Sequence, residues 1–294
     1  MALQSDGAIT LAQIAAEFGG STPHSLSEYY RNGSFVTSNN TNVPTSGTID
    51  FADFYGAVKQ ITVTISSGAT NQNASTLFGS NFTSNVPKIL IINSGVELGA
   101  TSLSNYALQV PSGMSGTLNI QNAGTISGAG GDGSTSLSSA GDAGGTALFI
   151  ASSNVTVTNT GTIRGGGGGG GRGNNGVQGG TTNPGGGIYC FSGTAGQGGN
   201  GGNGQGYDQS QTNGAGGGAR GAGSHTGGAF GAFYCGGYNA STDGSAGGNG
   251  GTYGNAGQNG VDNGSAGGAA GKYIQLSGVS YTLSNSGTLQ GNAP

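Results

Sequence analysis

Residues 159–171 read NTGTIRGGGGGGG, so that a strand-forming motif runs directly into an unbroken run of glycine. The motif N-x-G-T-[I/L]-x-G occurs at residues 122–128, 159–165 and 285–291, each time after a β-prone segment. Asparagine tolerates a left-handed backbone, and the Ile or Leu of each copy is expected to point into a shared core. A repeat of this kind predicts stacked turns and strands.

Glycine is concentrated between residues 165 and 271 and recurs at every third position within 167–179, 198–204 and 248–260. Period three is the repeat of the polyproline II helix, whose N–H and C=O groups have no partner inside the helix. Glycine lets neighbouring backbones approach closely enough to supply those partners. We therefore expect glycine helices packed side by side, on a template of the motif strands that enter at Asn159 and leave at Asn285. A disordered glycine-rich linker is the competing interpretation, whereas collagen lacks support because Pro184 is the only proline in this part.

The composition is far from that of an ordinary globular protein: of 294 residues, 69 are glycine, none is tryptophan and 6% are charged. A net charge of −4 with seven Lys and Arg offers no basic surface for phosphates, so we expect no nucleic-acid partner. The sequence shows no secretory signal or membrane-spanning segment, which predicts synthesis in a cytoplasm. Cys190 and Cys235 form either one late disulfide or two buried thiols.

Residues 1–58 carry the signals for short helices. A pseudo-repeat begins at Gly7 and again at Gly47, each time with a polar capping residue followed by apolar residues at helical spacing. Between the two copies, Ser25 and Glu28 fit a capping box. Because so short a segment buries little core of its own, its apolar faces are expected to pack on the next domain or on a partner protein.

From about residue 59 the hydrophobic period changes to two. Residues 60–65 alternate, residues 88–92 form an apolar run typical of a strand buried on both faces, and further short strands are expected at 106–110, 116–120 and 146–150. The expected fold is mostly β and irregular, with short N-terminal helices, a small region of stacked strands and a C-terminal polyglycine II helix sandwich. The expected parts are residues 1–58, 59–164 and 165–294.

The sequence offers no catalytic or metal-binding constellation, and we expect neither an enzyme nor a cofactor. Gly-x-Gly-x-x-Gly arises by chance in so glycine-rich a tract and lacks a surrounding strand-helix unit. His24 and His225 have no cluster of Cys, Asp or Glu at metal-ligand spacing, and His24 is expected to be structural.

At two places the sequence resembles the receptor-recognising adhesins at the tail-fibre tips of T-even-type bacteriophages. The segments are residues 159–171, quoted above, and residues 267–272, GGAAGK, which lead back to a strand. The opening, residues 1–9 together with 25–30, is similar to the starts of many phage virion proteins. The resemblance implies a sandwich of polyglycine II helices, distal variable loops that contact outer-membrane receptors, and an N-terminal attachment domain.

Aromatic segments interrupt the glycine rows, at the places where glycine helices running back and forth would turn. Tyr and Phe give a large rigid contact area at small entropic cost, so these segments are candidate contacts to a host cell-surface protein or glycan. The alternative is that they only cover the ends of the glycine rows. The candidate receptor-binding residues are Tyr189, Phe191, Tyr207, His225, Phe230, Phe233, Tyr234 and Tyr238.

We therefore expect a phage virion protein that acts as a tail-fibre or tail-tip adhesin. The alternatives are a structural virion component that recognises nothing, such as a tail or head fibre or a decoration protein, and, third, a glycine-rich cell-surface protein. The expected partners are other virion proteins of the fibre or baseplate, and a homotrimer is one assembly that the sequence allows. The candidate residues for attachment to the virion are Ile9, Leu11, Ile14, Phe51, Phe54 and Tyr55.

Overall fold

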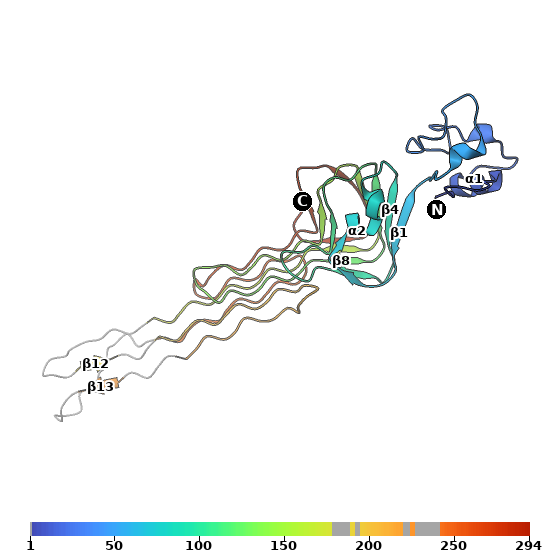
Figure 1. The fold of residues 1–294 in the computed structure, drawn as a ribbon. Coiled ribbons are helices and arrows are strands. Elements are labelled where there is room, and N and C mark those ends of the chain that lie inside the picture. Colours follow the sequence, from blue (N-terminus) through green and yellow to red (C-terminus); the bar gives the residue numbers. More distant parts are fainter. Residues whose placement is uncertain (1, 178–188, 192–194, 220–223, 227–241) are drawn as a thin grey trace.

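The computed structural model describes residues 2–177, 189–191, 195–219, 224–226 and 242–294 of the chain. The molecule is elongated: a small N-terminal region, a coil of strands and a bundle of extended glycine-rich segments follow one another (Figure 1). β12 (Tyr189–Phe191) and β13 (Ser224–Thr226) lie at the end farthest from the N-terminus. Among the described residues the α-helices are short, α1 (Leu11–Phe18) and α2 (Ala74–Phe78), so the expected mostly β character is confirmed.

The N-terminal region contains three capped helical turns: α1 and the 3-10 turns η1 (Leu26–Glu28) and η2 (Phe51–Phe54). In each, the N-cap side chain accepts a hydrogen bond from the first turn, and the side chain three positions on accepts one from the N-cap N–H. The capping box predicted at Ser25 is confirmed. The three pairs are Thr10 with Gln13, Ser25 with Glu28, and Asp50 with Asp53.

A small hydrophobic core lies inside the N-terminal region, which corrects the expectation that its apolar faces pack elsewhere. The rings of Phe18 and Tyr29 both meet Phe54 edge-on, with centroids 6.3 and 6.4 Å apart. Large aromatic side chains allow this short segment to bury a core of its own. The buried residues are Ile9, Ile14, Phe18, Tyr29, Val36, Val43, Phe54 and Ala57.

Three parallel sheets form the middle of the molecule, and the chain visits them in turn, so that each set of three strands is one coil stacked on the last. The first sheet is β1 (Ile61–Ile65), β4 (Lys88–Ile92), β7 (Leu118–Asn122), β10 (Val155–Asn159) and β15 (Tyr281–Asn285). The second is β16 (Thr288–Gln290), β11 (Thr162–Arg164), β8 (Thr125–Ser127), β5 (Glu97–Gly99) and β2 (Ala69–Thr70). The third is β14 (Ile274–Leu276), β9 (Leu148–Ile150), β6 (Leu108–Val110) and β3 (Gln72–Asn73).

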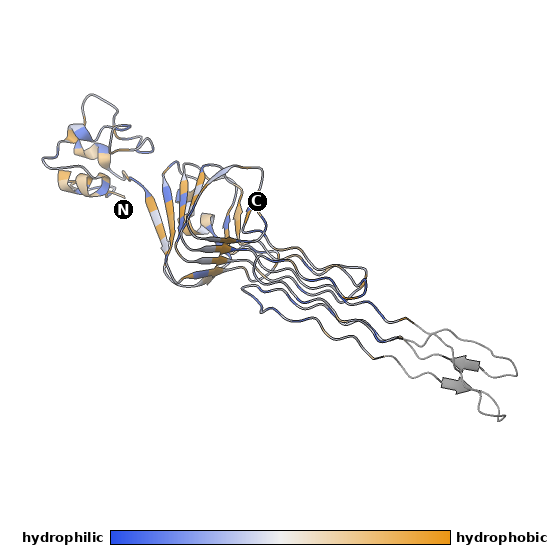
Figure 2. Cartoon of the chain, turned by 180° about the vertical axis from the view of Figure 1, so that it is seen from behind, coloured by the Kyte–Doolittle hydropathy of each residue, from blue (hydrophilic) through white to orange (hydrophobic). Residues whose placement is uncertain are grey.

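The core of the coil is a set of apolar columns that run across the strands. Leu98, Ile126 and Ile163 stack in register in the second sheet and are fully buried, as expected for the motif positions. α2 and η3 (Gly79–Phe82) bury Phe78 and Phe82 in the same core beside the first coil. Figure 2 shows apolar residues alternating with polar ones along these strands, which is the pattern of a sheet with one buried face.

β4 differs from the strand that the sequence predicts, because only one of its faces is buried. Leu90 and Ile92 point inward, whereas Ile89 and Ile91 are half-buried on the outer face. Lys88 also points inward and is 1% exposed. Its ammonium group donates to the carbonyl oxygens of Ser84, Val86 and Ser115 at 2.8, 2.8 and 2.7 Å.

The motif asparagines form a ladder through the coil. Asn122, Asn159 and Asn285 occupy one column of the first sheet, and each amide donates to the side-chain oxygen of the next at 2.7 Å. None of the three has the positive φ that the sequence analysis expected. Asparagine is therefore placed here for its side-chain amide, which can donate and accept within a buried column.

The glycine-rich segments are two excursions from this coil, between β8 and β9 and between β11 and β14. Apart from β12 and β13, the described residues of these excursions form eight extended rows that are bonded to one another along their length. Within the central row, residues 165–177, the N–H groups from Gly166 to Gly171 donate in turn to rows 141–145, 196–206 and 255–261, and the order repeats every third residue. Around the central row lie residues 128–134, 196–206, 242–252, 255–261, 264–271 and 141–145, each bonded to the next, and residues 212–218 lie outside this ring.

The spacing of glycine along the central row follows the number of other rows that surround it at each level. A Cβ at Gly169, Gly170 or Gly171 would overlap a carbonyl oxygen of three different rows, so the unbroken run marks the part that is enclosed on every side. Every third residue of the central row faces the same neighbour, and Gly166 and Gly169 face row 128–134. Arg172 is the next residue on that side, at a level where row 128–134 has already ended. Beyond it, glycine is retained at 173 and 176, where a Cβ would meet row 242–252.

Candidate functional site

The far end of the glycine rows carries three of the candidate residues, Tyr189, Phe191 and His225. β12 and β13 pair antiparallel there, with Cys190 opposite His225. This pairing brings the backbones of Tyr189, Phe191 and His225 together from segments far apart in the sequence. The candidates Phe230, Phe233, Tyr234 and Tyr238, and also Cys235, lie outside the described residues.

Four rows lead toward this end, namely residues 165–177, 196–206, 212–218 and 242–252. Hydrogen bonds join them up to the last residues that the structure describes. Gly176 donates to Gly196 at 2.8 Å, Gly196 to Thr242 at 3.1 Å, and Gly244 to Gly218 at 2.9 Å. Rows 128–134 and 141–145 and rows 255–261 and 264–271 turn back earlier. The lattice therefore contains fewer rows toward its far end, and the rows that turn back earlier support the four that extend.

Tyr207 is separated from the other candidates. Its backbone N–H donates to Gly128 at 3.1 Å, and its ring lies on Gly99 so closely that a Cβ there would overlap the ring. Gly99 ends β5 in the strand coil, so Tyr207 covers the opposite end of the rows from β12 and β13. The residue as a whole is 38% exposed, but the structure does not bring it together with Tyr189 or His225.

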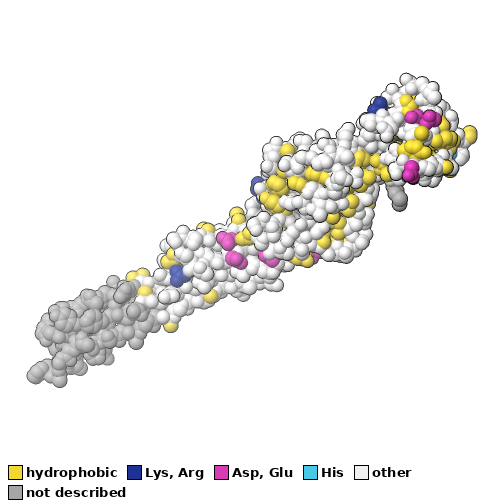
Figure 3. Space-filling view, in the orientation of Figure 1, with side chains coloured by type: hydrophobic (Ala, Val, Ile, Leu, Met, Phe, Trp, Pro, Cys, Tyr) yellow, Lys and Arg dark blue, Asp and Glu magenta, His cyan; other side chains and the backbone are white. Residues whose placement is uncertain are grey.

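The attachment candidates divide into buried and exposed residues. Ile9, Ile14 and Phe54 are 7%, 0% and 0% exposed because they form the core of the N-terminal region, so in this conformation they cannot contact a partner. Leu11 and Tyr55 are half-buried, and the Tyr55 hydroxyl donates to the carbonyl of Gly7 at 2.5 Å. Phe51 is 41% exposed. Figure 3 shows hydrophobic side chains gathered on the visible face of this region.

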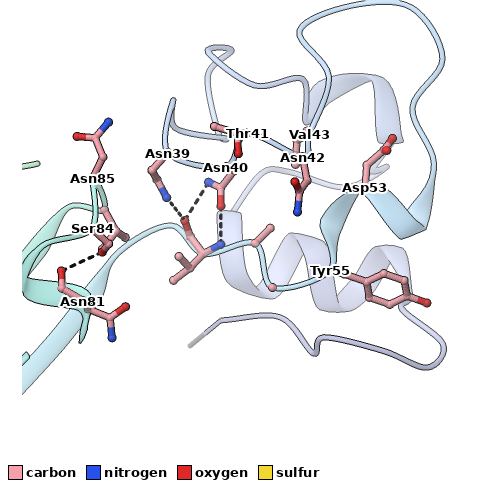
Figure 4. A pocket seen from close by; sticks show the side chains of 14 residues that line it. Asn39, Asn40, Thr41, Asn42, Val43, Asp53, Tyr55, Asn81, Ser84 and Asn85 are labelled. Carbon is pink, nitrogen blue, oxygen red and sulfur yellow. Dashed lines mark hydrogen bonds between the residues drawn. The ribbon is translucent and has the colours of Figure 1, made fainter. Parts of the chain in front are cut away.

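A pocket of about 240 Å³ lies where the N-terminal region meets the strand coil (Figure 4). Its asparagines hold the connection into β1: the Asn40 amide accepts from the N–H of Val58 at 2.7 Å and donates to its carbonyl at 2.9 Å. Asn39 donates to the same carbonyl at 3.2 Å. These amides hold Val58 against the N-terminal region just before the chain enters β1.

A polar network that the sequence analysis missed joins the strand coil to the base of the rows. The Arg164 guanidinium pairs with Glu97 at 2.9 Å, donates to Ser127 at 2.9 Å, and lies 3.6 Å above the ring of Tyr253. Burial is the main reason that the pKa of Tyr253 is raised. The sequence shows that Arg164 belongs to the second copy of the motif. It does not show that Arg164 contacts Tyr253, because that tyrosine lies far away in the sequence, in a turn between two rows.

Within the described residues, no group of three His, Cys, Asp or Glu side chains could hold a metal ion, and no helix is long and apolar enough to span a bilayer. The ring of His24 contacts the Tyr29 hydroxyl at 3.1 Å, inside the N-terminal region.

The comparisons with known proteins fit this geometry. The sequence profile described as phage tail fibre adhesin Gp38 matches residues 60–294. The crystal structure of the gp37-gp38 adhesin tip complex of the bacteriophage S16 long tail fiber is similar in fold, with a TM-score of 0.56 and 21% identity over 99% of this chain and 100% of that chain. No curated protein matches the sequence.

Proposed function

The chain belongs to the phage tail fibre adhesin Gp38 family, and we propose that it binds a host cell-surface protein or glycan through the far end of its glycine rows. It is a tail fibre adhesin and a component of the phage virion. Adhesion is a structural role, so binding rather than catalysis is the activity to test.

The observation that carries the proposal is the placement of β12 and β13 at the end of a hydrogen-bonded lattice, far from the N-terminal region. Variable contact residues serve best on a rigid support, because little conformational entropy is then lost on binding. The aromatic residues at 230–238 follow β13 directly in the sequence. We propose that they and the β12–β13 pair form the receptor-binding surface.

We also infer that the rows are polyglycine II helices packed as a sandwich. The support is the repeat of three in the hydrogen bonds of the central row and the glycine required wherever another row approaches. The central row finds all six neighbours within one chain. A homotrimer is therefore not needed to complete the lattice.

The N-terminal region, residues 1–58, is proposed to attach the adhesin to another tail fibre protein. The bounds 59–164 and 165–294 that the sequence suggested do not separate the strand coil from the rows, because rows 128–134 and 141–145 precede Gly165 and the coil strands β14, β15 and β16 follow the last row. The similar structure from bacteriophage S16 is a complex of gp37 with gp38, which makes a fibre protein the partner to test. Phe51 is the exposed aromatic candidate. Phe51→Ser should abolish co-purification with the fibre protein, whereas Leu103→Ser on the strand coil, at 38% exposure, should not.

Receptor binding is tested with purified protein and host cells. The variant carries Phe233→Ala, Tyr234→Ala and Tyr238→Ala, and a matched control carries Leu103→Ala, Leu137→Ala and Val261→Ala, which remove exposed apolar groups elsewhere. We expect only the first variant to bind cells more weakly than wild type, while it keeps the wild-type circular dichroism and melting temperature. If the folded first variant binds as well as wild type, the aromatic segment is not the receptor-binding surface. If wild type binds no host cell, the structural virion role is favoured.

A further inference from the structure

The outer face of the first sheet has a regular register and carries no charged side chain. Along each of its strands, alternate residues point into the core and out to solvent, as the buried Leu90, Ile120 and Val157 show for the inner side. The outward residues belong to two columns and are half-buried or exposed. They are Thr62, Thr64, Ile89, Ile91, Asn119, Gln121, Thr156, Thr158, Thr282 and Ser284; we call this set the hydroxyl-amide face.

The register of the sheet sets the spacing of these groups. Gln121 lies directly between Ile91 on one neighbouring strand and Thr158 on the other. Strands that pair in a sheet are about 4.8 Å apart, so each column offers a side chain at that interval across five strands. This interval is close to the length of one hexose unit in a linear polysaccharide.

The face supplies uncharged hydrogen-bonding groups that the protein itself leaves open. Among the described residues, the side chains of Gln121, Thr156 and Ser284 have no hydrogen-bond partner in the protein. The Thr158 hydroxyl donates to Asn119 at 3.3 Å, which leaves the Asn119 amide nitrogen for another acceptor. Amides and hydroxyls both donate and accept, as recognition of paired sugar hydroxyls requires.

A hollow of about 230 Å³ lies on this face, at the ends of β4, β7 and β10. It is smaller than the sites of about 300 to 1,000 Å³ that hold drug-sized ligands, and it suits a single sugar ring. Ile91 and Ala123 offer apolar contact for the C–H face of a ring, while Gln121 and Thr158 stand beside them. The remaining lining residues are Asn122 and Thr160.

We propose that the hydroxyl-amide face binds a linear, uncharged polysaccharide of the host cell surface. The polysaccharide runs across the strands, with one ring in the hollow and neighbouring units along the two columns. This is a second binding surface, on the side of the strand coil, and it does not depend on the receptor at the far end of the rows. It would hold the adhesin to the cell coat while the far end searches for its receptor.

The neutral character of the ligand follows from the charges of the sheet. Lys88 is the basic residue within its five strands, and that side chain points inward, where three carbonyl oxygens surround its ammonium group. No basic side chain is therefore available among the columns to pair with a carboxylate, sulfate or phosphate on a glycan. An acidic polysaccharide would lose its hydration here without gaining an ion pair.

The test is an array of linear oligosaccharides of four or more hexose units, with sialylated and sulfated chains as charged counterparts, probed with the full-length protein. The variant combines Gln121→Ala with Thr158→Val, which removes an amide and a hydroxyl and keeps the shape of the strand. The control is Gln109→Ala, a half-buried glutamine on the outer face of the third sheet. The variant with alanine at Phe233, Tyr234 and Tyr238 is probed in parallel.

We expect wild type to bind one or more neutral chains and to ignore the charged ones. The Gln121→Ala/Thr158→Val variant should bind about tenfold more weakly, with the Gln109→Ala control and the aromatic variant unchanged. Retained binding by the aromatic variant separates this surface from the receptor site. The proposal is overturned if wild type binds no neutral chain, if only charged chains bind, or if the double variant binds as wild type does.

Discussion

The side-chain amide of Asn159 donates a hydrogen bond of 2.7 Å to the side-chain oxygen of Asn285, although the two residues are 126 positions apart in the sequence. The central row of glycines leaves the strand coil just after Asn159, and the chain has returned to the coil before Asn285. The contact therefore joins the two ends of the second glycine-rich excursion within the strand coil. Asn122 continues the same ladder on the other side of Asn159.

The ladder should contribute to stability mainly through its buried members. Asn159 is fully buried, and Asn159→Ala would leave one N–H of the buried Asn122 amide without its acceptor. An unsatisfied buried polar group costs about 1 to 3 kcal/mol, so the free energy of unfolding in urea should fall by that amount. Asn285→Ala, at the exposed end of the column, should cost less than half as much. Equal losses from the two variants would argue against the ladder.

Replacing glycine by alanine should destabilise the rows only at positions that another row approaches closely. A Cβ at Gly169 would overlap the carbonyl oxygen of Asp132, whereas a Cβ at Gly216 has no atom within 4 Å. Gly169→Ala should therefore destabilise the lattice by about 1 to 3 kcal/mol or more and expose it to limited proteolysis. Gly216→Ala should leave the digestion pattern unchanged. Digestion that is as slow for Gly169→Ala as for wild type would show that the rows are not so closely packed.

Lys88 should stabilise the coil in a way that depends on pH. Burial lowers the pKa of Lys88 below its usual 10.5, so between the lowered value and 10.5 the unfolded chain binds more protons than the folded one. The stability contributed by this group therefore rises with pH across that window. Lys88→Met removes three hydrogen bonds to buried carbonyls and should cost about 3 to 5 kcal/mol. The stability difference between wild type and Lys88→Met, measured in urea, should grow as pH rises toward 10.5; a constant difference would contradict this account.

The network at the base of the rows should hold the turn around Tyr253 in place. Arg164→Met keeps the apolar stem over the ring but removes the ion pair with Glu97 and the cation over the ring. Because the pair is half exposed, the loss in stability should be only about 1 to 2 kcal/mol. Hydrogen exchange at residues 252–255 should become faster. Arg172→Met, which removes a single hydrogen bond to Asn175 at 3.0 Å, should leave that exchange unchanged.

Much of the architecture could be predicted because it follows from local periodicity. The capping box at Ser25, the strands and the stacked motif at Ile126 and Ile163 all use signals within a few residues. The glycine pattern also carries spatial information, since the unbroken run before Arg172 marks a fully surrounded row and the later spacing of three marks a row open on one side. The spacing of glycine therefore indicates on how many sides a row is packed, but not which rows pack against it.

The errors of sequence reasoning concern contacts between distant segments. Tyr207 looks like its aromatic counterparts in the sequence, yet its ring is needed to cover Gly99 in another coil. Ile14 and Phe54 were assigned outward roles because nothing local shows that 58 residues can enclose a core. The asparagine ladder was missed for the same reason, because Asn122 and Asn159 meet only when coils stack.

The central claim is that the end of the glycine rows decides which host the adhesin recognises. The most direct measurement exchanges residues 178–241 for the corresponding segment of a family member that adsorbs to a different host, and follows adsorption of phage carrying the chimaera to both hosts. The account predicts that adsorption switches to the second host while the rest of the chain keeps its protection from proteolysis. A chimaera that is folded and still adsorbs only to the original host would contradict it.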